Sequence, residues 1–243
     1  MPKIGNKEQV VTFSEIGGTI TRWQYHGIDI FYPQQLVKRR KEREQKLRGG
    51  MHACWPCFGT VDPTFGLPQH GVLRNRKADE IMENGVVFRG TDLLGPAYDE
   101  ECEVRIDIVL TRMGLTHSLS ARLLRPASRD VFINPGLHPY FRTPTGNAQA
   151  RAWKGEELRF YRRNHGPIST SVGHGADVNI PSIGKVQMLL TGGWSRVYYW
   201  RDSRRYLCVE PVFGNSMKYG DSRCLLLTDK WFNMSCAFQV SQD

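Results

Sequence analysis

The chain has 243 residues, a length that fits one larger all-β domain or two small domains. Hydrophobic residues make up 40% of the chain and aromatic residues 11%, so a sizeable core can form. No apolar run approaches the roughly 18 residues that a membrane helix needs. The segment 1–9 also lacks the apolar stretch of a secretory signal. We therefore expect a cytoplasmic protein without a membrane partner.

The net charge of +9 favours an anionic partner, either nucleic acid or a phosphorylated small molecule. Much of the charge lies in the run Lys38–Arg48, which also contains two glutamates and no aromatic residue. Proteins that bind single-stranded nucleic acid place aromatic residues among their basic ones. We interpret the run as a solvated excursion, with nucleic-acid binding as the alternative. Arg48 differs because it precedes Gly49-Gly50, where the backbone can approach a ligand closely.

The six cysteines are scattered, and without a signal segment we expect reduced, buried thiols. One pair forms a C-x-x-C motif, Cys54-Trp55-Pro56-Cys57. A thiol–disulfide site of this kind needs a following helix whose N-terminus lowers the thiol pKa, but Phe58-Gly59 and a Pro/Gly-rich segment follow instead. A zinc site needs a second ligand pair at suitable spacing, and none is evident. We predict no metal and no redox role.

Short stretches of alternating apolar and polar residues recur along the chain, separated by turn-forming residues, and helical periodicity is nearly absent. The clearest is Cys102–Leu110, which continues past Gly114 into Leu115–Leu124 as a predicted hairpin. Two or three strands are predicted within Val10–Pro33. The other predicted strands are Gly85–Gly90, Val131–Phe141, Leu158–Tyr161, Val186–Leu190, Arg196–Arg201, Tyr206–Val212, Arg223–Leu227 and Phe232–Val240. The pattern predicts an all-β sandwich or barrel in one domain, 1–243.

The segment Arg48–Arg76 is rich in glycine and proline and shows no helical or strand period. It is predicted to be a long loop, and long loops in compact proteins are usually functional or disordered. Trp55, Phe58 and Phe65 argue against disorder. Because the loop gathers arginines, histidines and glycines, we expect it to bind a polar, anionic ligand.

Three residues could carry acid–base chemistry. His70 lies between Gln69 and Gly71 in the predicted loop, and His138 follows Leu137 near a strand end. Glu210 lies within the apolar stretch Tyr206–Val212, where Pro211 indicates a sheet edge or a strand end. Two readings of Glu210 stay open: a buried carboxylate with a raised pKa, suited to act as a general base, or a solvent-facing residue of the alternation. The other five histidines receive no role.

Four sets of residues together resemble the aldose 1-epimerase (mutarotase) superfamily, and most closely its branch that acts on hexose 6-phosphates. The opening hairpins are similar around Gly17-Gly18-Thr19-Ile20. The central segment is similar to the motifs R-G-G-x-x-x-x-W-P-x-F-G and L-P-x-H-G-x-x-R, over 48–59 and 67–74. Two later stretches, 137–141 and 208–211, are similar to L-H-T-Y-F and C-x-E-P. The late W-N-P segment of the family is replaced here by 198–202, without Asn-Pro.

The resemblance implies a large antiparallel β-sandwich of the galactose mutarotase-like kind and interconversion of sugar anomers. Glu210 would remove the proton of the C1 hydroxyl, and His138 would protonate the ring oxygen. His70 would help to hold that oxygen. No metal or organic cofactor is implied.

The resemblance also implies how the substrate is held. Arg48 and Arg74 match family positions that face a 6-phosphate, which agrees with the basic charge of the chain. Asp177 is the best match for an acid that binds sugar hydroxyls. We expect a monomer whose partner is a small-molecule sugar or sugar phosphate, and no nucleic acid. A non-catalytic sugar-binding protein on the same fold is the alternative function.

Overall fold

The computed structural model describes residues 1–38, 45–59, 66–154, 157–160, 165–171, 173–181, 183–201, 203–214, 224–228 and 230–241. In these ranges the regular structure is β-strand, apart from two short 3₁₀ helices, η2 (Leu73–Asn75) and η3 (Asp92–Leu94). Neither has the length or apolar character to cross a membrane. The predicted all-β, antiparallel sandwich is confirmed, since every pairing between the named strands is antiparallel.

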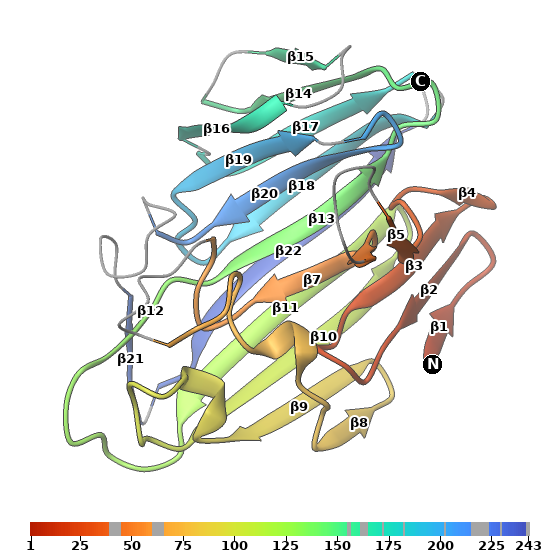
Figure 1. Cartoon of the computed structure of the whole chain (residues 1–243). Helices are drawn as coiled ribbons and strands as arrows, with labels where there is room; N and C mark the ends of the chain where they lie inside the picture. The colour runs from red at the N-terminus through yellow and green to blue at the C-terminus, as the bar shows by residue number, and fades with distance from the viewer. Residues whose placement is uncertain are drawn as a thin grey trace.

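Two large sheets lie one over the other, with their strands running in similar directions (Figure 1). The first sheet follows the order β1 (Lys3–Gly5), β2 (Gln9–Phe13), β3 (Ile20–Tyr25), β7 (Met51–Cys54), β13 (Gly136–Arg142), β20 (Tyr206–Val212), β19 (Arg196–Arg201) and β16 (His165–Ser171), and β4 (Ile28–Asp29) pairs with β3. The second follows the order β15 (Leu158–Phe160), β14 (Ala148–Ala152), β17 (Gly175–Ile180), β18 (Gly184–Thr191), β22 (Phe232–Ser241), β11 (Gly114–Leu123), β10 (Cys102–Thr111), β9 (Gly85–Gly90) and β8 (Glu80–Met82).

Two smaller ribbons complete the description. One pairs β12 (Val131–Ile133) with β21 (Cys224–Leu226), and the other pairs β5 (Gln35–Val37) with β6 (Lys46–Arg48). The basic run Lys38–Arg48 follows β5 and includes β6, and its residues 39–44 are outside the described residues. The guanidinium of Arg48, at the end of β6, lies 5.8 Å from the ring centre of Trp200 on β19, so the ribbon β5–β6 adjoins the first large sheet.

Aromatic rings from both sheets meet in the core between them. Phe238 on β22 contacts Phe31 at a centroid distance of 5.4 Å, Trp23 on β3 at 6.0 Å and Phe141 on β13 at 6.2 Å. Trp23, Phe31, Phe141 and Phe238 are all fully buried. Burial of a large aromatic side chain stabilises a fold by about 1.5–3 kcal/mol, so this cluster is a main attachment between the sheets.

The β10–β11 hairpin shows directly how the sequence alternation becomes structure. Its register runs from Cys102 opposite Leu123 to Thr111 opposite Gly114, as the predicted hairpin requires. Alternate residues of β10 are buried against the first sheet, and those between them are partly or fully exposed. A Cβ atom on Gly114 would lie 1.8 Å from the carbonyl oxygen of Phe238 on the neighbouring strand. This turn therefore requires glycine for close strand approach.

The prediction that the whole segment Arg48–Arg76 is loop was wrong. It contains the strand β7, which pairs with β3 on one side and β13 on the other, and the helix η2. Every residue of β7 is buried, so no polar alternation marks it in the sequence. Gly50 precedes it with a positive φ of 69°, and a Cβ there would lie 2.0 Å from the carbonyl oxygen of Ile20.

The other strand predictions were largely confirmed, with two exceptions. Val131–Phe141 is not one strand, because the chain passes at Asn134-Pro135 from β12 in the small ribbon to β13 in the first sheet. Seven further strands were not predicted: β1, β5, β6, β8, β14, β16 and β17. Of these, β14 is rich in alanine, which has a weak preference for strands. Residues Tyr161 and Arg223 of the predicted strands lie outside the described residues.

The free thiols agree with the prediction from sequence. All six cysteines are unbonded to one another, and five are buried, while Cys224 on β21 is partly exposed. Burial raises the thiol pKa of Cys57 to about 12 and that of Cys54 well above its usual range. These thiols are therefore protonated and unreactive at neutral pH, as expected of packing residues rather than of a redox pair.

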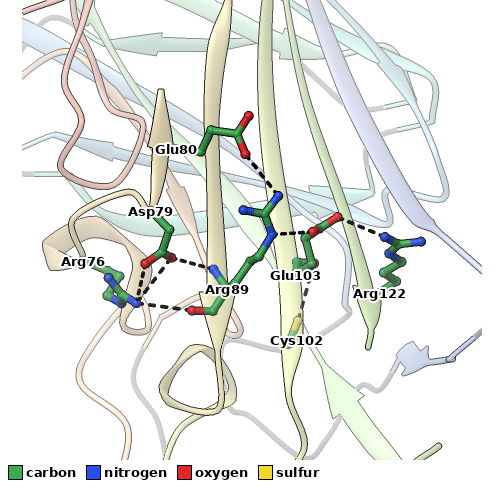
Figure 2. A network of polar contacts seen from close by, with 7 residues as sticks. All are labelled: Arg76, Asp79, Glu80, Arg89, Cys102, Glu103 and Arg122. Atoms are coloured by element: carbon green, nitrogen blue, oxygen red, sulfur yellow. Dashed lines mark hydrogen bonds and ion pairs between the residues drawn. The ribbon is translucent and has the colours of Figure 1, made fainter. Parts of the chain in front are cut away.

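Charged side chains cover the outer face of the second sheet near its β8 edge (Figure 2). Arg89 on β9 donates to Glu103 on β10 at 2.7 Å and to Glu80 on β8 at 3.2 Å, and Arg122 reaches the same Glu103 at 3.4 Å. Exposed pairs of this kind contribute about 0–1 kcal/mol each. Their more important effect is that charges along an edge oppose pairing with a further strand.

One titratable residue lies in the core and predicts an acid-dependent loss of stability. His117 on β11 is 1% exposed, and burial lowers its pKa to about 4. The folded pKa is below the unfolded value near 6.5, so the unfolded chain binds the proton first as the pH falls. The contribution of the neutral His117 to the free energy of unfolding is about 3 kcal/mol. It is fully present above about pH 6.5 and is lost as the pH falls from about 6.5 to about 4.

We expect His117→Leu to lose less stability than wild type when urea unfolding is compared at about pH 7 and about pH 4.5. The change in stability between the two pH values is compared for the two proteins, because other buried histidines also contribute to it. Parallel pH profiles for the two proteins would show that His117 is not the group responsible.

Candidate active site

The site lies on the face of the first sheet that points away from the core. On β13, Leu137 and Phe141 belong to the core, so His138 and Tyr140 point to the opposite face. On β20 the same alternation places Leu207 and Val209 in the core. The residues that alternate with these core residues on neighbouring strands therefore lie together on the outer face of the sheet.

Glu210 on β20 and Trp200 on β19 reach this face by the same rule, because Val209 and Tyr199 belong to the core. On β7, Met51 and Ala53 belong to the core, so His52 points outward. The face is not exposed, since His138 and Glu210 have only 5% and 4% of their surface accessible. Of the two interpretations of Glu210, a buried carboxylate or a solvent-facing residue, the structure supports the buried carboxylate. Strand β20 is paired on both sides, so Pro211 lies near a strand end and not at a sheet edge.

A cavity of about 240 Å³ opens over this face. Three strands, the ribbon β5–β6 and the segment 69–74 contribute to its walls. The residues that line it are Arg48, Gln69, His70, Arg74, His138, Tyr140, Trp200 and Glu210. The lining combines two aromatic rings with several convergent polar and charged groups, which is the usual composition of a small-molecule site.

His138 and Glu210 form a buried acid–base pair. The Nε2 atom of His138 lies 3.5 Å from Oε1 of Glu210. Burial raises the pKa of the Glu210 carboxyl well above its usual range. Burial also lowers the pKa of His138, and nearby His52, His70 and Arg74 lower it further. Both shifts favour the uncharged forms of the two side chains.

Two rings hold the His138 imidazole in place. Tyr140 stacks with it at a centroid distance of 4.6 Å and an angle of 11°, and His52 stacks with it at 4.9 Å and 24°. His52 is the direct neighbour of His138 across β7 and β13. A second cavity of about 60 Å³ is lined by His52, Arg74 and Tyr140 among others. The stack fixes the plane of the imidazole that Glu210 faces.

His70 presents a hydrogen-bond donor to the cavity. Its backbone has φ 66°, and the backbone N–H of Gly59 donates to its Nδ1 atom at 3.2 Å. Burial, with Arg74 and Arg48 nearby, lowers the pKa of His70 to about 4. The ring is therefore neutral at neutral pH, and since Nδ1 accepts, Nε2 carries the hydrogen. An Nε2–H group suits a ligand oxygen.

Arg48 and Arg74 give the cavity a positive potential. The guanidinium of Arg48, at the end of β6, lies 5.8 Å from the centre of the Trp200 ring, a cation–π distance. Arg74 comes from η2. Both arginines lower the pKa of His70 and His138 by charge repulsion, which reflects their closeness to the catalytic candidates. An anionic group on a ligand is favoured here.

Asp177 is the one residue predicted for the site that the structure does not bring to the cavity. It lies on β17 of the second sheet. Its carboxylate accepts from Trp153 Nε1 at 3.1 Å and pairs with Lys185 Nζ at 3.2 Å. Asp177 therefore lies on the other sheet and is not among the residues that line the cavity.

Four residues of the site were not assigned a role from the sequence: His52, Gln69, Tyr140 and Trp200. A usable signal existed for Tyr140, because residues two apart on a strand share a face and His138 was already a candidate. His52 and Trp200 had no such signal, since their strands reach the site only through the pairing of β7 with β13 and of β19 with β20.

Similarity to known proteins was found only at the level of structure. Neither a protein-family model nor a curated protein matches the sequence. Among solved structures, the Slr1438 protein of Synechocystis sp. has 18% identity and a TM-score of 0.77, with 100% of this chain and 96% of that chain covered. A galactose mutarotase-like protein from Lactobacillus casei has 13% identity and a TM-score of 0.77, with 99% and 100% covered.

A galactose mutarotase related enzyme from Lactobacillus acidophilus has 14% identity and a TM-score of 0.72, with 99% and 97% of the two chains covered. At these identities the likeness defines the fold. The chain therefore has the galactose mutarotase-like sandwich fold, as the resemblance of its motifs implied.

The hydrogen-bonding pattern of His70 can be checked in solution. At neutral pH we expect the Nε2–H tautomer, because Nδ1 accepts the Gly59 N–H, and we expect protonation only near pH 4. Two-bond ¹⁵N–¹H correlation spectra recorded across a pH titration report both properties, and His70→Gln assigns the signals. A His70 signal that titrates near pH 6.5, or an Nδ1–H tautomer, would contradict the geometry.

Proposed function

We propose that the protein is an aldose 1-epimerase, a mutarotase that interconverts the α and β anomers of a hexose and favours a hexose 6-phosphate. The observation that carries the proposal is the buried pair His138–Glu210, 3.5 Å apart, on a cavity lined by two arginines. Mutarotation needs an acid and a base that act on two oxygens of the same carbon, so the two groups must be close together. Fold, pair and cavity support the same reaction.

The chemistry proceeds in two balanced halves. The Glu210 carboxylate takes the proton of the C1 hydroxyl while the protonated His138 donates to the ring oxygen, and the bond between C1 and the ring oxygen breaks. The product is the open-chain aldehyde, with Glu210 protonated and His138 neutral. After rotation about the C1–C2 bond, the reverse transfers close the ring as the other anomer. The net charge of the pair is unchanged throughout.

Burial raises the pKa of Glu210 and lowers that of His138, which favours a protonated Glu210 beside a neutral His138. This is the protonation state that closes an open-chain sugar. Opening a cyclic sugar requires the proton to move from Glu210 to His138, over a separation of 3.5 Å. Sugar hydroxyl groups that replace lost solvation would lower the cost of the charged pair. The stack of His52 and Tyr140 keeps Nε2 in place during this exchange.

The remaining lining residues would bind and orient the sugar. His70 would donate its Nε2–H to the ring oxygen or to an adjacent hydroxyl. Trp200 and Tyr140 offer apolar ring faces, on which the C–H surface of a pyranose can pack. We propose that the protein is a cytoplasmic monomer with one domain, and that it acts on a small molecule without a cofactor.

The preference for a phosphorylated sugar rests on Arg48 and Arg74. Guanidinium groups bind phosphate through paired, charge-assisted hydrogen bonds. Both arginines line the same cavity as the acid–base pair, so a phosphate held there leaves the sugar ring near His138 and Glu210. The net charge of +9 would also attract an anionic substrate.

The reaction is tested by following a freshly dissolved α-anomer of glucose and of glucose 6-phosphate by polarimetry or NMR. We expect wild type to accelerate mutarotation, and Glu210→Gln and His138→Ala each to lower kcat by about 10²–10⁴-fold, because each removes one proton-transfer group. Asp177→Asn is the matched control, since it makes the same carboxylate-to-amide change on the other sheet and should retain activity. Saturable binding of these sugars with no acceleration would leave a binding protein and end the mutarotase proposal.

The phosphate preference is tested with the same assay. We expect Arg74→Ala to raise KM for glucose 6-phosphate by 10-fold or more and KM for glucose only slightly, because charged hydrogen bonds contribute about 1.5–3 kcal/mol each. Arg74→Lys should fall between, since it keeps the charge but not the planar fork.

Arg76→Ala is the control for this experiment, because Arg76 pairs with Asp79 (Figure 2) and also with Asp92 on the outer surface. It removes the same positive charge two residues further along the chain. Equal effects of Arg74→Ala on both sugars, or an Arg76→Ala variant with the same loss, would remove the phosphate assignment.

A further inference from the structure

We propose that the acid–base pair also forms a binding site for a soft divalent cation of the Zn²⁺ class, completed by the thiol of Cys208. Occupancy of this site would block the cavity reversibly. The site is defined by His138, Cys208 and Glu210, the one such group of metal-ligand side chains among the described residues. One atom of each lies within 4.8 Å of the others, and all three residues are buried.

The sheet itself creates this grouping. Cys208 and Glu210 are two residues apart on β20, so they share its outer face, and His138 lies on the adjacent strand β13. A tetrahedral Zn²⁺ binds histidine nitrogen at about 2.0–2.1 Å and carboxylate oxygen at about 2.0–2.2 Å. Two such ligands are then about 3.4 Å apart, which agrees with the observed 3.5 Å between His138 Nε2 and Glu210 Oε1. The Cys208 sulfur lies within 4.8 Å of both of these atoms. It would move closer to them to complete the coordination of the ion.

The donor set selects the metal. A thiolate with an imidazole and one carboxylate favours Zn²⁺ or Cd²⁺ over Mg²⁺ or Ca²⁺, which prefer oxygen ligands only. Binding displaces the protons of Cys208 and Glu210, and the resulting thiolate and carboxylate balance the charge of the ion. The complex is thus neutral beside Arg48 and Arg74. A fourth coordination position is left for water.

Binding should be reversible and weaker than at a structural zinc site. The Nδ1 atom of His138 has no hydrogen-bond partner in the described structure, whereas metal-binding histidines normally donate their second N–H to an acceptor. Loss of that contact typically weakens metal binding by 10–100-fold. The ion would occupy the two atoms that transfer protons, so it would exclude sugar turnover. This inhibitory consequence rests on the proposed function, whereas the binding itself does not.

Binding is tested by titrating the full chain with Cd²⁺ and recording the ultraviolet charge-transfer absorption of the Cd–thiolate bond. We expect one equivalent to bind, and Cys208→Ser to lose the absorption or to weaken it at least 10-fold. Cys57→Ser is the matched control, because it removes another buried thiol and should keep the absorption. Glu210→Gln provides a second test that keeps the thiol, and should weaken Cd²⁺ affinity at least 10-fold. Circular dichroism verifies folding of each variant.

Inhibition is tested with Zn²⁺ in the mutarotation assay. We expect Zn²⁺ to inhibit wild type competitively with the sugar, and Cys208→Ser to keep basal activity while losing at least 10-fold in sensitivity. An unchanged absorption in Cys208→Ser, an unchanged affinity in Glu210→Gln, or equal Zn²⁺ sensitivity of Cys208→Ser and wild type would overturn the proposal. Cys208-dependent Cd²⁺ binding in a chain without mutarotation would support the metal site while ending the proposed function.

Discussion

The two-residue repeat of the strands in the first sheet is the constraint on which the rest of the structure depends. Leu137 and Phe141 must face the core, so His138 has to face the other side. The same requirement turns Glu210 outward from β20. Packing of the core and assembly of the site are thus one event, and a shift of register by one residue would bury His138 in the core and expose Leu137.

Burial on the outer face gives these residues their chemistry. The cavity is closed enough that His138 and Glu210 both have shifted pKa values that favour their uncharged forms. Arg48 and Arg74 line the same cavity and add positive potential to it. The rings of His52 and Tyr140 restrain the imidazole of His138. The Gly59 N–H fixes the tautomer of His70. The same set of residues thus combines groups suited to proton transfer with groups suited to binding an anion.

The same closeness has a second chemical consequence. A base and an acid 3.5 Å apart, with a thiol on the same strand face, also have the spacing of metal ligands. Cys208 was read from the sequence only as part of a C-x-E-P motif and as a packing thiol. Its position two residues before Glu210 supports the proposed role as a metal ligand, which depends on β13 lying alongside.

The sequence by itself determined the all-β class, the β10–β11 hairpin and the candidates His70, His138, Arg48, Arg74 and Glu210, because alternation, turn residues and motif spacing are local properties. Only the tertiary structure decided that β7 is a central strand, that Glu210 is buried and that Asp177 lies on the other sheet. It also decided that His52 and Trp200 belong to the site. These facts depend on which strands pair across long separations in the chain, and such pairing leaves no local pattern in the sequence.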